Sequence, residues 1–185
     1  MRKLTALLLV LVAVAGATEL YWDDGVEGGA TDDELMGVSF GEEYGSPGDT
    51  GGLPGTITAF RVAVSNFQSA DPPLVYIYSV RQCKPDELLE GPLVGSWTQD
   101  YWSTFTPDEP VDVPSAFFVI LGNISAPSYL LDDGTGPDYP PDSHSYYCSS
   151  GSWYDRVRDY MLRIEWTPDT AVEELSWGAI KADRP

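Results

Sequence analysis

Acidic side chains are the most abundant groups in this sequence that could do chemistry, and they gather in two clusters. The chain contains 29 Asp and Glu among 185 residues. One cluster lies between residues 23 and 33, and the other comprises Asp132, Asp133, Asp138 and Asp142. Calcium takes about six to eight oxygen ligands from carboxylates and carbonyls, so Asp132, Asp133 and Asp138 could hold a structural calcium ion. Neither cluster has EF-hand spacing, and solvated acidic turns are the simpler interpretation.

Aromatic side chains form the second group, because the chain has six Trp and eleven Tyr. Sugar-binding sandwiches stack pyranose rings on exposed aromatic faces and hold the hydroxyl groups with carboxylates and amides. Ordinary packing within sheets is the alternative use of such residues. The candidates for ligand binding adjoin predicted loops: they are Tyr101, Trp102, Tyr139, Trp153 and Tyr154.

Catalytic motifs are missing from the sequence. His144 is the only histidine, so a conventional nucleophilic triad would depend on it alone. We find no Gly-x-Ser-x-Gly elbow, no His-Glu-x-x-His pair and no glycine motif that could cradle a phosphate. A pair of acids could hydrolyse glycosides, but 29 acids offer too many pairs for any one to be informative. We therefore expect a protein that is not an enzyme and requires no cofactor.

The N-terminus has the pattern of a secretory signal peptide. Arg2 and Lys3 precede an apolar run from Leu4 to Val14, and Ala15-Gly16-Ala17 is a small-residue cleavage site. The run is shorter than the roughly 20 residues that a membrane-spanning helix needs. We expect residues 1–17 to be removed and the remainder to be secreted, extracellular or at the cell surface, with no membrane span.

Charge and cysteine content agree with that compartment. The formal net charge is −19, and such a field repels phosphate backbones, so nucleic acid is not an expected partner. The only two cysteines are Cys83 and Cys148. In an oxidising compartment an even number of cysteines predicts a disulfide between them.

Short alternating runs between frequent glycines and prolines predict an all-β fold: two antiparallel sheets packed as a β-sandwich of jelly-roll type. In Thr58–Val64 and Leu74–Val80 alternate residues are apolar, as on strands with one buried face. Residues 116–121 are apolar on both faces, which predicts a central strand. We place the sandwich at residues 18–167 and a tail, which could be a linker, a strand or a helix, at 168–185. Other predicted strands are 19–22, 35–40, 95–104, 128–131, 145–148 and 160–166.

Three local patterns resemble secreted jelly-roll modules of poorly characterised bacterial lineages. The start Glu19-Leu20-Tyr21-Trp22-Asp23-Asp24-Gly25 is similar to their opening strand. The stretch from His144 through Gly151-Ser152-Trp153-Tyr154 to Asp159-Tyr160-Met161-Leu162-Arg163-Ile164 resembles their closing strands, and residues 175–181 resemble a linker ahead of a sorting domain. The resemblance implies an accessory, non-catalytic sandwich.

These observations lead to one functional expectation and one rival. We expect a secreted, non-catalytic module that binds an extracellular glycan or a surface protein through its loops. The rival is a structural subunit that associates with itself in an extracellular layer or filament. In that case residues 18–25 or 167–185 would add a strand to a neighbouring sheet edge.

Overall fold

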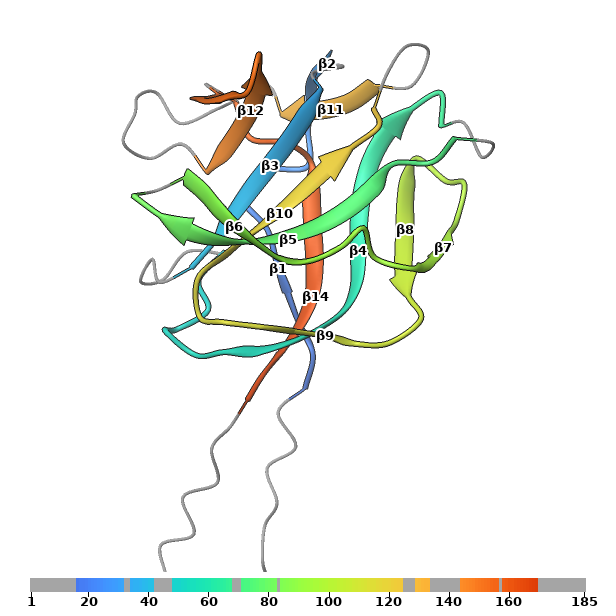
Figure 1. Cartoon of the computed structure of the whole chain (residues 1–185). Helices are drawn as coiled ribbons and strands as arrows, with labels where there is room; N and C mark the ends of the chain where they lie inside the picture. Colours follow the sequence, from blue (N-terminus) through green and yellow to red (C-terminus); the bar gives the residue numbers. More distant parts are fainter. Residues whose placement is uncertain are drawn as a thin grey trace, which may run out of the picture.

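The computed structural model describes residues 16–31, 34–41, 48–67, 71–82, 84–124, 129–133, 144–156 and 158–169. Within these residues the protein is all-β, and two antiparallel sheets pack face to face as a sandwich (Figure 1). This confirms the predicted fold class. No helix long and apolar enough to cross a membrane occurs in this part of the chain.

One sheet has eight strands, joined in the order β1-β14-β4-β11-β2, with β8 and β9 also paired to β4 and with β7 paired to β8. The long strand β4 is therefore the centre of this sheet. Its members are β1 (Thr18–Leu20), β2 (Glu27–Thr31), β4 (Gly55–Ser65), β7 (Gly95–Trp97), β8 (Trp102–Pro107), β9 (Val111–Val113), β11 (Tyr129–Asp133) and β14 (Leu162–Pro168).

The other sheet has six strands in the order β13-β12-β3-β10-β5-β6. Its central strand β10 is buried at every position, as its apolar sequence predicts. The members are β3 (Leu35–Phe40), β5 (Leu74–Arg81), β6 (Lys84–Glu90), β10 (Phe117–Gly122), β12 (Ser145–Ser149) and β13 (Ser152–Asp155).

The main core lies between the two sheets and is built by alternate residues of strands such as β3, β10 and β14. On β4, Phe60, Val62 and Val64 belong to this core, while Ala63 belongs to a smaller cluster with Leu131. A period of two therefore assigns the faces as the sequence predicted. The other fully buried core residues include Met36, Val38, Phe40, Ile77, Phe117, Val119, Leu121, Leu130, Tyr160, Leu162 and Ile164.

The predicted strands differ from the observed ones in number more than in position. The single strand predicted over residues 95–104 is a hairpin of β7 and β8, because Asp100 and Tyr101 turn the chain between them. Strands β2, β6, β9 and β13 were not predicted, since Gly and charged residues dominate two of them and the other two have only three or four residues. Residues 1–15 and 170–185 lie outside the described residues, so the signal peptide and the tail stay predictions.

The predicted disulfide is not present. Cys148 is a free, buried cysteine on β12, and Cys83 lies outside the described residues. The residues directly opposite Cys148 on the neighbouring strands are Leu35 of β3 and Trp153 of β13. A disulfide needs its two Cα atoms within about 7 Å of each other.

Candidate functional site

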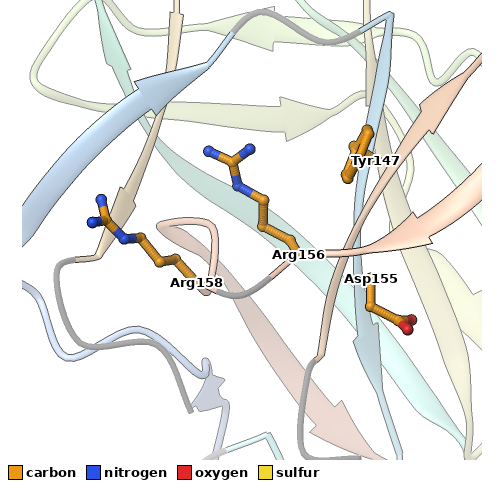
Figure 2. A pocket seen from close by; sticks show the side chains of 4 residues that line it. All are labelled: Tyr147, Asp155, Arg156 and Arg158. Carbon is orange, nitrogen blue, oxygen red and sulfur yellow. The ribbon is translucent and has the colours of Figure 1, made fainter. Parts of the chain in front are cut away.

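A pocket of about 280 Å³ lies beside the β12–β13 hairpin, and four side chains line it: Tyr147, Asp155, Arg156 and Arg158 (Figure 2). Tyr147 belongs to β12, Asp155 ends β13, and Arg156 and Arg158 lie in the segment after it. None of the four was among the residues predicted to bind a ligand. Its volume is near the lower end of the range for small-molecule sites, about 300 to 1,000 Å³, so the pocket suits a ligand of one or two rings.

A buried carboxylate holds the two arginines at the edge of the pocket. Asp132, at the end of β11, has a side chain that is 1% exposed. Its Oδ2 accepts a hydrogen bond from Arg156 Nη2 at 2.7 Å, and its Oδ1 accepts one from Arg158 Nη1 at 3.4 Å. The same Nη1 donates to the carbonyl oxygen of Gly28 at 3.2 Å. Asp132 therefore ties the segment after β13 to the edge of the opposite sheet.

The aromatic side of the pocket comes from the hairpin itself. Tyr147 and Tyr154 are directly opposite in the β12–β13 ladder, and their rings stack with centroids 5.4 Å apart and planes 25° apart. Tyr154 is 48% exposed. Cross-strand pairs of this kind stabilise a hairpin and also leave an aromatic face open to a ligand. The hairpin thus places a phenol ring beside two guanidinium groups.

A second group of acids surrounds Asp133, the residue that follows Asp132 in the sequence. Asp133 is 2% exposed, and its Oδ2 accepts a hydrogen bond from the Asp24 amide at 3.3 Å. Its Oδ1 is buried and has no hydrogen-bond partner among the described residues. Burial, then the charge of Asp159, raises the pKa of Asp133 to about 6. Burial also raises the pKa of Asp159, which accepts a hydrogen bond from the Ser145 hydroxyl at 3.0 Å.

Asp23 completes this acidic group, and its charge is matched. Arg163 donates two hydrogen bonds to it, from Nη2 to Oδ1 at 2.6 Å and from Nε to Oδ2 at 3.1 Å. These bonds to Asp23 raise the pKa of Arg163. The two predicted acidic clusters therefore meet in space through Asp23, Asp24 and Asp133.

The predicted aromatic residues lie in different places. Trp102 packs on the outer face of the eight-stranded sheet, with the guanidinium of Arg163 4.5 Å from its ring centroid and that of Arg61 at 5.7 Å. Two cations therefore lie beside this ring, which indicates a structural role. Tyr101 is 51% exposed beside it. Its hydroxyl donates to Glu27 at 3.3 Å, and burial, then the Glu27 charge, raises its pKa.

Among the described residues, one of the predicted ligand residues adjoins the pocket. Tyr154 stacks on its lining residue Tyr147, whereas Trp153 packs on the outer face of the six-stranded sheet against the cluster of Phe118 and Tyr146. Tyr139 lies outside the described residues. Neighbouring strand positions face opposite sides, which separates Trp153 from Tyr154.

The predicted calcium ligands have other partners. Asp132 binds two arginines and Asp133 accepts from the Asp24 amide, while Asp138 lies outside the described residues. In the part of the chain that the structure describes, no group of three or more His, Cys, Asp or Glu side chains is arranged to hold a metal ion. Structural calcium stays a prediction. His144 is half-buried and stacks on Trp22, with ring centroids 3.5 Å apart.

Sequence reasoning missed the arginines, although one signal could have revealed them. The chain has only ten Lys and Arg against 29 acids, yet Arg156 and Arg158 are two positions apart. No family model, curated protein or solved structure matches this chain.

Proposed function

We propose that this protein is a secreted, non-catalytic β-sandwich module that binds a carbohydrate of an extracellular surface in the pocket beside the β12–β13 hairpin. The observation that carries the proposal is the stacked pair Tyr147–Tyr154 next to Arg156 and Arg158. Aromatic faces contact the apolar face of a pyranose, while guanidinium N–H groups donate to its oxygens. The N-terminal export pattern supports an extracellular ligand.

Rigid positioning supports a binding role. The tyrosines are fixed by a hairpin ladder and the arginines by a buried carboxylate, so the pocket loses little conformational entropy when a ligand enters. The pocket therefore has the two properties of a pre-formed sugar site, an aromatic wall and convergent polar donors.

Self-association through the N-terminal end receives less support. Residues Thr18–Leu20 form β1, which pairs with Ile164–Trp166 of β14 in the protein's own sheet. A strand already paired within its own domain offers only its outer edge to a neighbour. We therefore place carbohydrate binding ahead of assembly.

A glycan array followed by titration of the best glycan tests the proposal. We expect Tyr154→Ala to weaken binding about tenfold, since stacking on an aromatic ring contributes roughly 1 kcal/mol or more. Tyr101→Ala is the matched control, because Tyr101 is 51% exposed against 48% for Tyr154 and lies in the turn between β7 and β8 of the other sheet. A blank array would overturn the proposal, as would a glycan whose binding depends on Tyr101 and not on Tyr154.

A further inference from the structure

The two arginines of the pocket differ in how their donors are used. Arg156 is 28% exposed and makes a short ion pair with Asp132, at 2.7 Å. Arg158 is 45% exposed, and its printed hydrogen bonds to Asp132 and Gly28 both come from Nη1. A guanidinium carries five N–H donors in a planar fork. Arg158 therefore keeps Nη2 and Nε for a further acceptor, and no described residue occupies them.

A carboxylate is an acceptor that matches such a fork. Two N–H groups of one guanidinium match the two oxygens of a carboxylate, and these charge-assisted bonds are about twice as strong as neutral ones. The one acid that lines the pocket does not serve this purpose, because the Asp155 carboxylate points away from both guanidinium groups (Figure 2). In the free protein these donors reach solvent, since Arg158 is 45% exposed, and a carboxylate of the ligand can take the place of that water.

The rest of the molecule limits how many carboxylates the ligand can carry. The formal net charge is −19, so a long polyanion is repelled as it approaches. A single carboxylate on an otherwise neutral ligand gains the contact with Arg158 without that repulsion. The neighbouring tyrosine pair adds the requirement for a ring.

We infer that the pocket selects a uronic acid unit, a pyranose ring with one carboxylate, borne singly on an otherwise neutral glycan. Arg158 binds the carboxylate, the Tyr147–Tyr154 pair contacts the ring, and Asp132 holds Arg158 in place from behind. This inference rests on the proposed function and names the ligand class of the same site.

Two small probes that differ in one group test the inference. Methyl β-D-glucuronide carries a carboxylate where methyl β-D-glucoside carries a hydroxymethyl group. We expect NMR titration of the full-length mature protein to show the glucuronide binding about tenfold more tightly than the glucoside, since a hydrogen bond to a charged group contributes roughly 1.5 kcal/mol. Arg158→Gln should abolish this preference, because it removes the guanidinium fork that pairs with a carboxylate. Arg81→Gln is the matched control, because Arg81 is 73% exposed on the β5–β6 hairpin.

The outcomes separate the inference from the proposed function. Equal binding of both glycosides, insensitive to Arg158→Gln, overturns the inference and leaves the carbohydrate module standing. No binding of either glycoside, together with a blank glycan array, overturns both. If the capped amino acid N-acetyl-glutamate amide binds as tightly as the glucuronide, the site recognises a carboxylate without a ring, and the sugar assignment is wrong. Polygalacturonate should bind more weakly per site than the glucuronide at low salt and gain affinity as salt screens the repulsion.

Discussion

Asp132 and Asp133 are neighbours at the end of β11, with exposed fractions of 1% and 2%. Among the described residues, however, only Asp132 has cation partners. Two guanidinium groups bind Asp132, at 2.7 and 3.4 Å. Asp133 has no cation partner among the described residues, one of its oxygens has no hydrogen bond there, and Asp159 adds a like charge nearby. Neighbouring side chains on a strand face opposite sides of the sheet. The register of β11 against β2 also shifts between Asp132 and Asp133, which further separates the surroundings of the two carboxylates.

The comparison shows that, where two acids are equally buried, their partners decide what each one does. A paired carboxylate fixes its cations, and at Asp132 these are the cations of the pocket. An unpaired one takes up a proton at higher pH than usual, as the raised pKa of Asp133 indicates. One strand end therefore carries both a positioning group and a proton-binding group.

Removing the charge of Asp132 should have the largest effect. We expect Asp132→Asn to lower the free energy of unfolding at pH 7 by about 3 kcal/mol, because it leaves two partly buried guanidinium groups without their counter-charge. Urea unfolding measures this change. The control is Asp112→Asn on β9, where an exposed carboxylate accepts from Thr56 and an amide oxygen can replace it. That control should stay within about 0.5 kcal/mol of the original protein, and equal losses in the two variants would contradict the comparison.

Removing the charge of Asp133 should change the response to pH. Its folded-state pKa of about 6 lies above the ordinary value of 3.8, so the folded protein binds this proton more tightly than the unfolded chain does. The resulting contribution to stability is therefore complete below about pH 4 and is lost as the pH rises to 6. Between pH 4 and pH 7 the original protein loses this contribution to its unfolding free energy. Asp133→Asn has no such proton to lose, so we expect its unfolding free energy to fall by about 2 kcal/mol less over the same interval. Urea unfolding at both pH values checks this, and parallel pH profiles would refute it.

The fold followed from the sequence wherever burial imposes a period of two. Phe60, Val62 and Val64 face the core because alternate apolar residues on a strand must share one face, and residues 116–121 are central because both their faces are apolar. Strands such as Glu27–Thr31 and Lys84–Glu90 could not be predicted in this way. They lie at sheet edges, where side chains can remain in solvent. Glycines and charged residues are therefore tolerated there, and apolar and polar residues need not alternate.

The candidate site followed from the sequence only in part, since long-range pairing creates it. Tyr154 was predicted because it adjoins a loop, but its stacking on Tyr147 depends on the register of the β12–β13 hairpin. The tie between Asp132 and Arg156 spans 24 residues and requires both sheets to be assembled. Asp132 was predicted as a calcium ligand because carboxylates bind calcium. In the structure its carboxylate binds Arg156 and Arg158.

The smallest expected effect concerns Gly29 on β2, which lies against the same ion pair. A Cβ atom there would lie 2.9 Å from Asp132 Oδ1 and 3.1 Å from Arg158 Nη1, closer than ordinary contact. Since Asp132 is also bound by Arg156, we expect Arg158 to move instead, at a cost of about 1 kcal/mol in unfolding free energy. Urea unfolding and the NMR signal of the Arg158 Nε–H group measure the two effects.

Gly41→Ala is the control for this last prediction, because its nearest contact would be Ala116 Cβ at an ordinary 3.5 Å. That variant should stay within about 0.5 kcal/mol of the original protein. If Gly29→Ala shifts the Arg158 signal and weakens glucuronide binding while Gly41→Ala does neither, the position of Arg158 depends on the narrow space between β2 and Asp132. If Gly29→Ala lowers stability and leaves the Arg158 signal unchanged, Asp132 moves instead, and the contrast between a fixed carboxylate and an adaptable arginine is wrong.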